Sequence, residues 1–128
     1  MRYCLDSNVI IDMFRGETAI KAKLESMEHY CITPVVLCEL FKGAYAAQGK
    51  DEAIKLVEAF LHSAELLEFN EHACRLFGQR YASLKQKGKT TQESDLMIAC
   101  TALSHNCILV TRNTKDFVNV QGLRVISV

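Results

Sequence analysis

The feature that most constrains the fold is a short run at residues 107–111, Cys-Ile-Leu-Val-Thr, which polar residues flank on both sides. Every position in the run is apolar or β-branched, whereas a strand with one solvated face would alternate apolar and polar residues. A strand that is covered on both faces is typical of a parallel sheet between two layers of helices. We therefore expect an α/β protein with a fully buried central strand.

Other short β-rich segments recur along the chain and alternate with segments of helical periodicity. The strand-like segments are residues 2–5, 30–32, 65–69, 107–111 and 123–127, the last of them expected at an edge of the sheet. Five helices are expected between them: from a cap at Ser7 to Gly16, from Pro34 through Glu39, over 51–62, from a cap at Asn70 to Gly88, and from a cap at Ser94 or Asp95 through Leu103. This alternation predicts a three-layer α/β/α sandwich around a mostly parallel sheet of four to five strands.

Length and composition limit the classes of protein that remain. The 128 residues, 49% of them hydrophobic, fit one domain spanning residues 1–128. No apolar stretch is long enough to cross a membrane, and the first residues are typical of a strand rather than of a signal peptide. None of the six cysteines forms a CxxC pair, so we expect small buried side chains in a reducing compartment, the cytoplasm.

Four acidic residues lie where strands are expected to end or helices to begin: Asp6, Glu39, Asp95 and Asp116. In open α/β sheets, ligands bind outside the carboxyl ends of the strands, and Asn113 belongs at the same edge. Clustered carboxylates suit a hard divalent cation such as Mg²⁺ or Mn²⁺. Taken singly, Asp6 and Asp95 could be helix caps and Asp116 a turn residue. Glu39 is more telling because it lies in an apolar run, where a buried free charge would be costly.

Four local motifs, in a specific order, carry a resemblance to a known family. They are Leu5-Asp6-Ser7-Asn8, then Leu37-Cys38-Glu39-Leu40 with Gly43, then Asp95-Leu96-Met97-Ile98-Ala99, and finally Val110-Thr111-Arg112-Asn113 followed by Asp116-Phe117. With these motifs the chain resembles the PIN-domain ribonucleases, specifically the VapC-type toxins of bacterial toxin–antitoxin pairs. Residues 89–94 depart from the Gly/Pro-containing form that is commoner in the family before the third aspartate.

The resemblance implies a role for each matching residue. Asp6, Glu39, Asp95 and Asp116 would be the catalytic acidic quartet and would hold Mg²⁺, with Mn²⁺ as an alternative and Asn113 as a further polar neighbour of the metal. Asp6 and Asp95 would be the most direct ligands. The residues themselves add three expectations: Ser7 and Thr111 would hydrogen-bond to the ligating carboxylates, and Arg112 would contact a phosphate.

The activity that the resemblance implies is metal-dependent hydrolysis of RNA phosphodiester bonds by a toxin, with an RNA substrate, a VapB-like antitoxin and a second copy of the chain as partners. A basic rim would meet the RNA, and its candidates besides Arg112 are Arg15, Arg80, Lys85, Lys87 and Lys89. The run at 85–89 is more typical of a solvated helix end. Apolar helical residues that could form a dimer face or an antitoxin groove, or could simply belong to the core, are Phe14, Leu40, Phe41, Tyr45 and Phe60. Two alternatives stay open: a non-catalytic Mg²⁺-binding module with a receiver-like fold, and a degenerate PIN domain that only binds RNA.

Overall fold

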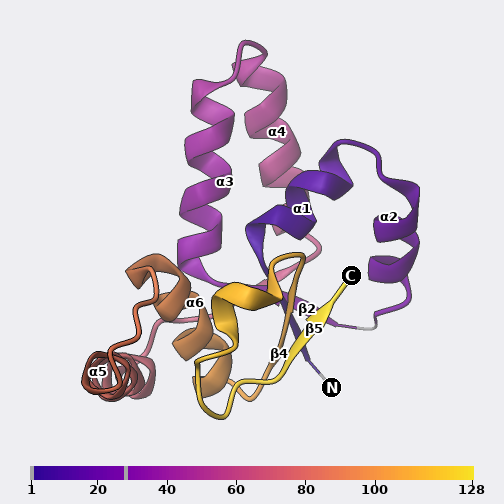
Figure 1. Cartoon of the computed structure of the whole chain (residues 1–128). Coiled ribbons are helices and arrows are strands. Elements are labelled where there is room, and N and C mark those ends of the chain that lie inside the picture. The colour runs from indigo at the N-terminus through magenta and orange to yellow at the C-terminus, as the bar shows by residue number, and fades with distance from the viewer. Residues whose placement is uncertain (1, 28) are drawn as a thin grey trace.

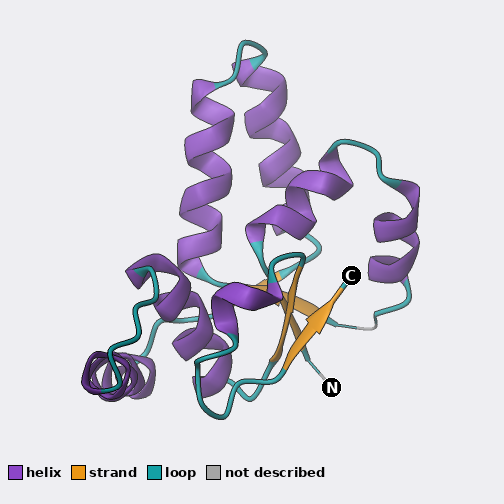
Figure 2. Ribbon diagram, in the orientation of Figure 1, coloured by secondary structure: helices purple, strands orange, loops and turns teal. Residues whose placement is uncertain are grey.

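The computed structural model describes residues 2–27 and 29–128, and a parallel sheet lies at its centre with helices around it (Figure 2). The strands follow the order β3-β2-β1-β4-β5, and all four neighbouring pairs are parallel. They are β1 (Tyr3–Leu5), β2 (Tyr30–Ile32), β3 (Glu65–Leu66), β4 (Ile108–Thr111) and β5 (Val125–Ser127). The predicted α/β fold class, with helices on both faces of a parallel sheet, is confirmed.

Six α-helices and one 3₁₀ turn connect these strands within the described residues (Figure 1). They are α1 (Ser7–Phe14), α2 (Thr18–Glu25), α3 (Pro34–Ala46), α4 (Lys50–Leu61), α5 (Glu71–Gln86), α6 (Glu93–Ser104) and the turn η1 (Thr114–Phe117). Asn70 caps α5 as predicted, since its side chain accepts a hydrogen bond from the Ala73 N–H at 2.8 Å. Gly88 follows the end of α5 with a φ of +68°, which glycine adopts at little cost.

The order of the strands determines where a ligand can bind. The chain moves outward from β1 to β2 and β3, and then returns to place β4 on the other side of β1. Right-handed crossovers then put α1 to α4 on one face of the sheet and α5 with α6 on the other. Figure 1 agrees, with α5 and α6 lying together and apart from α1 and α2. The topological switch point, where ligands of such sheets bind, therefore lies between the carboxyl ends of β1 and β4.

The core explains why the sheet forms. All four residues of β4 are buried, and Leu109 and Val110 have no exposed surface. One hydrophobic cluster joins this strand to Ile10 of α1 and Leu96 of α6, which cover opposite faces. Burial of apolar surface on both faces is the main contribution to the stability of such a sheet.

Of the predicted helix caps, Asp6 is confirmed, whereas Ser7, Ser94 and Asp95 are not caps, and the structure has one helix more than predicted. Asp6, and not Ser7, is the N-cap of α1, because its carboxylate accepts a hydrogen bond from the Ser7 N–H at 2.9 Å. Helix α6 begins at Glu93, so Ser94 and Asp95 lie in its first turn and neither caps it. Helix α2 was not predicted, because it buries only Ile20 and Leu24 and therefore has a weak apolar pattern.

The segments predicted as strands at 65–69 and 123–127 are shorter in the structure, where β3 covers Glu65–Leu66 and β5 covers Val125–Ser127. The expectation of buried cysteines holds for four of the six thiols; Cys38 on α3 and Cys74 on α5 are exposed, because they lie on the outer faces of their helices. All six are free thiols. None of the helices in the described part of the chain is long and apolar enough to cross a membrane.

Shortening a buried side chain of the central strand β4 tests whether this strand lies in the core. We expect Leu109→Ala to lower the free energy of unfolding by about 2–5 kcal/mol, because Leu109 has no exposed surface and its loss leaves a cavity. Val118→Ala is the control, since Val118 is 71% exposed and should change stability by less than about 0.5 kcal/mol. Urea denaturation measures both, and equal effects at the two positions would contradict the assignment of β4 to the core.

Candidate metal-binding active site

Asp6 lies at the switch point because the register of β1 and β4 places it there. Tyr3, Cys4 and Leu5 pair with Ile108, Leu109 and Val110, so the next residues, Asp6 and Thr111, lie side by side. The Asp6 N–H donates to the Val110 carbonyl at 2.9 Å, and the Thr111 hydroxyl donates to Asp6 Oδ2 at 2.8 Å. The other oxygen, Oδ1, accepts from the Ser7 N–H. Asp6 is thus a helix cap and an ordered carboxylate at once.

The surroundings of Asp6 disfavour its charged form. It is one of the few buried polar residues, with 6% of its surface exposed. Burial raises the pKa of Asp6, hydrogen bonds from Thr111 and Ser7 lower it, and repulsion from Asp116 raises it, so that the net shift is upward. A carboxylate that keeps two hydrogen-bond donors and still has a raised pKa lies in a site with too little positive charge.

Glu39 and Asp95 bring further negative charge to Asp6 from two different helices. Glu39 is exposed on the surface of α3, so the expected buried charge in its apolar run is not found. Partial desolvation of its carboxyl still raises its pKa, and repulsion from Asp6 and Asp95 adds to the shift, while the Ser7 hydroxyl and Lys42 act against it. Burial also raises the pKa of Asp95, and repulsion from Asp116 and Asp6 brings it to about 6. Both residues are therefore near enough to Asp6 to repel its charge, although Asp95 lines a cavity with Asp116 and Glu39 lines another one along α1, α3 and α4.

Asp116 completes the group from the turn after β4. Its Oδ2 accepts a hydrogen bond from the Asn113 side-chain amide at 2.7 Å, and the Asn113 N–H donates to the Thr111 hydroxyl at 3.0 Å. Together with Asp95, Asp116 lines an open cavity of about 440 Å³, to which Thr90, Thr91, Gln92, Lys115 and Asn119 also contribute. Asn113 thus orients one carboxylate of the crevice.

The acidic side chains lie near one another but do not yet surround one point. Within residues 2–27 and 29–128, no three histidine, cysteine or acidic side chains lie close enough together to hold a metal ion as they stand. Repulsion between neighbouring carboxylates contributes to the raised pKa values of Asp6, Glu39 and Asp95. The donor set fits a hard divalent cation, because it consists of oxygens and because a cation would relieve the repulsion.

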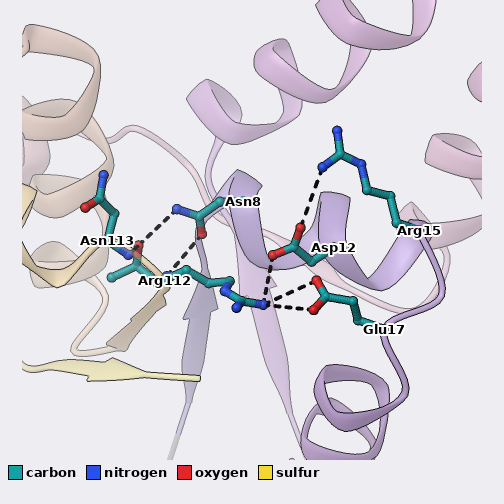
Figure 3. Close-up of polar contacts among 7 residues, drawn as sticks. Asn8, Asp12, Arg15, Glu17, Arg112 and Asn113 are labelled. Carbon is teal, nitrogen blue, oxygen red and sulfur yellow. Dashed lines mark hydrogen bonds and ion pairs between the residues drawn. The ribbon is translucent and has the colours of Figure 1, made fainter.

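Asn8, a residue to which the sequence reasoning gave no role, ties α1 to the end of β4 (Figure 3). Its side-chain oxygen accepts from the Arg112 N–H at 3.2 Å, and its amide donates to the Thr111 hydroxyl at 3.4 Å. Two signals in the sequence point to it: Asn8 ends the motif Leu5-Asp6-Ser7-Asn8, and it is a polar residue just before the apolar run Val9-Ile10-Ile11. Asn8 therefore helps to hold Thr111, which in turn holds Asp6.

Arg112, the residue expected to contact phosphate, has two carboxylate partners in the structure (Figure 3). Its Nη1 lies 3.0 Å from Asp12 Oδ2 and 3.3 Å from Glu17 Oε2. Arg15 lies farther from the same aspartate, at 3.9 Å. Two neighbouring carboxylates reduce the positive charge that Arg112 presents to an anion. The phosphate contact stays a prediction, and neither Asp12 nor Glu17 was expected here.

The hydroxyl of Thr111 is the hub of the ordered part of the site, and its removal should be measurable. We expect Thr111→Val to lower the free energy of unfolding by about 1.5–3 kcal/mol near neutral pH, because Asp6 loses a hydrogen bond to its charged form. The pKa of Asp6 then rises further, so the loss should shrink as pH falls and Asp6 becomes protonated. Thr111→Ser, which keeps the hydroxyl, is the control. Urea denaturation in EDTA, from neutral pH down into the acid range in which Asp6 becomes protonated, is the measurement. A loss of stability that does not depend on pH would contradict the role of Thr111.

Comparison with known proteins places this geometry in a family. The model of the PIN domain matches residues 3–123. Ribonuclease VapC1 of Haemophilus influenzae (strain R2866) is 32% identical over 128 residues, covering 97% of this chain and 96% of that protein. The structure of VapBC-1 from nontypeable Haemophilus influenzae contains a chain with a TM-score of 0.91 and 30% identity, with 99% of this chain and 98% of that chain covered.

A chain in the structure of VapBC2 from Rickettsia felis, bound to a DNA fragment from their promoter, aligns with a TM-score of 0.92 and 26% identity, covering 100% of this chain and 99% of that one. The similarity thus extends along nearly the whole chain, from β1 with Asp6 to the turn with Asp116, and the resemblance read from the four motifs is confirmed. The protein belongs to the PIN-domain family, as a relative of the VapC ribonucleases.

Proposed function

We propose that this protein is a metal-dependent endoribonuclease and the toxin of a VapBC-type toxin–antitoxin pair. The observation that carries the proposal is the group of four mutually repelling carboxylates at the switch point of the sheet. The VapC ribonucleases among its relatives, and the VapBC complexes among the similar structures, support the same function. Mg²⁺ is the metal that we propose, with Mn²⁺ able to replace it.

Each residue of the crevice has a part in this proposal. Asp6 and Asp95 would bind the cation directly, and Glu39 and Asp116 would ligate it or its waters. A bound divalent cation lowers the pKa of water and neutralises charge on a phosphodiester. Thr111 and Ser7 would hold Asp6 in place, and Asn113 would do the same for Asp116.

Further parts of the proposal concern the molecule's partners and its setting. A cavity of about 490 Å³ runs along α1, α3 and α4, and Glu39, Phe14 and Leu40 are among its lining residues. A VapB-like antitoxin could fill this cavity and reach the crevice at Glu39. Leu40 and Phe60 are core residues, while Tyr45 is 63% exposed and remains a candidate for a dimer face. We propose that residues 1–128 act as one domain, in the cytoplasm, where free thiols persist.

Neutralising Asp95 tests the active site. We expect Asp95→Asn to reduce Mg²⁺-dependent RNA cleavage by more than about a hundredfold, because losing a ligand should cost more than losing a group that merely supports one. The metal-free variant should also be more stable than the parent protein. A carboxyl whose pKa is raised to about 6 on folding contributes stability that is present below pH 4 and is lost as pH rises through about 6. At about pH 7.5 the charged carboxylate therefore destabilises the metal-free fold, and its replacement by a neutral amide should raise the free energy of unfolding.

Asp51→Asn is the matched control, since Asp51 is an exposed aspartate in the first turn of α4. Loss of its favourable interaction with the helix dipole should lower stability slightly, by about 0.3–1 kcal/mol, and should leave cleavage intact. Electrophoresis of cleaved RNA and thermal unfolding in EDTA measure the two effects. An Asp95→Asn variant that still cuts RNA at the parent rate would refute the proposed site.

The raised pKa of Asp95 predicts how metal binding depends on pH. Protons and the cation compete for the carboxylate, so affinity for Mn²⁺ should be constant above about pH 7 and should fall by about tenfold or more per pH unit below about 6. The raised pKa values of Asp6 and Glu39 would make the decline steeper. Isothermal titration calorimetry over this range checks the prediction, which fails if affinity is independent of pH or rises in acid.

A further inference from the structure

A second cavity adjoins the acidic crevice on the side of α5 and α6. Its volume is about 590 Å³, and its lining residues are Tyr81, Leu84, Lys85, Gly88, Lys89, Thr90, Thr91, Gln92, Glu93 and Leu96. Three of them, Thr90, Thr91 and Gln92, also line the cavity that contains Asp95 and Asp116. A linear ligand that reaches the carboxylates could therefore continue into this second space across a shared wall.

Tyr81 gives the second cavity an aromatic surface. Its side chain is 43% exposed, although it lies on a helix that packs against α6. The ring stacks on that of Phe77 one turn earlier, with centroids 6.2 Å apart and an interplanar angle of 19°. A ring that is supported in this way and still open to the cavity can stack with a nucleobase, an interaction that tolerates any base.

The charge of the cavity favours a phosphate next to that base. Lys85 and Lys89 both line it, against one acidic residue, Glu93. Lys89 reaches across to Asn119, with 3.3 Å between Nζ and Oδ1, so its ammonium group lies between α5 and the segment after η1. No acidic partner within 4.0 Å is found for either lysine among the described residues, whereas Arg112 has two. Apart from Lys115, which lines the cavity of Asp95 and Asp116 itself, the available positive charge beside the crevice is thus on the α5–α6 side.

We propose that this cavity is a nucleotide subsite for single-stranded RNA, in which Tyr81 stacks with a base and Lys85 and Lys89 bind the adjoining phosphate. The subsite would hold the nucleotide next to the bond that is cut, with residues 90–92 as the wall between the two. This inference rests on the proposed ribonuclease function and adds to it a binding site for one base with its phosphate and the direction of the RNA's path.

Binding measurements separate the subsite from catalysis. In an Asp95→Asn background, so that no cleavage occurs, fluorescence anisotropy with a short single-stranded oligoribonucleotide and Mg²⁺ would report affinity. We expect Tyr81→Ala to weaken binding by about tenfold, and Tyr81→Phe to retain most of the affinity because it keeps the ring. Tyr45→Ala is the matched control: Tyr45 is exposed, also follows a phenylalanine by one turn, and lines neither cavity.

The lysines should affect the salt dependence rather than the stacking. The double variant Lys85→Gln with Lys89→Gln should reduce the slope of log affinity against log salt by about 0.7, since each phosphate neutralised on a single strand contributes about 0.7 and the two lysines share one phosphate. Arg112→Gln should change this slope less than the double variant does. A double-stranded RNA of the same sequence should bind more weakly than the single strand, because its bases are not free to stack on Tyr81.

An oligonucleotide series with one abasic position tests Tyr81 without relying on the folding of a variant. One abasic position should weaken binding to the parent background by about tenfold and should have no effect once Tyr81 is replaced by Ala. If no position behaves in this way, or if Tyr81→Ala and Tyr45→Ala have equal effects, the subsite is wrong. If the wild-type protein cuts RNA and these variants bind normally, the subsite fails while the ribonuclease proposal stands. If the wild type cuts no RNA but the abasic effect is found, the ribonuclease proposal fails while the subsite stands.

Discussion

Uncompensated negative charge at the carboxyl ends of β1 and β4 is the constraint on which the rest of this site depends. Asp6, Glu39 and Asp95 all have raised pKa values, with burial as the main cause and mutual repulsion as the next. Asp6 is buried, Asp95 is half-buried and Glu39 is exposed. A stable fold gains nothing from such an arrangement, since like charges held close together without a cation cost free energy. The arrangement is typical of a site that is completed by a divalent cation.

The scaffold withstands this charge because Asp6 is held by strong local interactions. One carboxylate oxygen caps α1 and the other accepts the Thr111 hydroxyl, which is completely buried. Each oxygen keeps a lone pair that could face a metal ion. Asn8 and Asn113 both hydrogen-bond to Thr111, so residues from α1, β4 and the following turn form one ordered unit. A site built on loops would be more mobile than this one, whose carboxylate is held by a strand and a helix.

The fold class could be read from the sequence because local patterns determine it. The run at 107–111 shows a strand that is buried on both faces, and Asn70 with Gly88 marks the ends of α5. The acidic positions could be found for a related reason, as strand ends in a parallel sheet meet at one edge. Helix α2 escaped prediction because its two buried residues leave almost no periodic signal.

Other features depended on residues that are distant in the sequence and could not be predicted from it. The ion pairs of Arg112 with Asp12 and Glu17 join segments about a hundred residues apart, and nothing local in the sequence points to them. The exposure of Cys38 and Cys74 depends on which face of each helix meets the sheet. The sequence offered both Asp6 and Ser7 as the cap of α1, because both are good caps, and only tertiary contacts with Thr111 fix Asp6 in that position.

The most direct test of the central claim is a crystal structure of the protein grown with Mn²⁺, in which anomalous scattering locates the ion. We expect an anomalous peak in the crevice, with oxygens of Asp6 and Asp95 at about 2.1–2.2 Å from the ion and with Glu39 and Asp116 moved inward to the ion or its waters. A crevice that stays without a peak at saturating Mn²⁺, or an ion bound only elsewhere on the molecule, would contradict it.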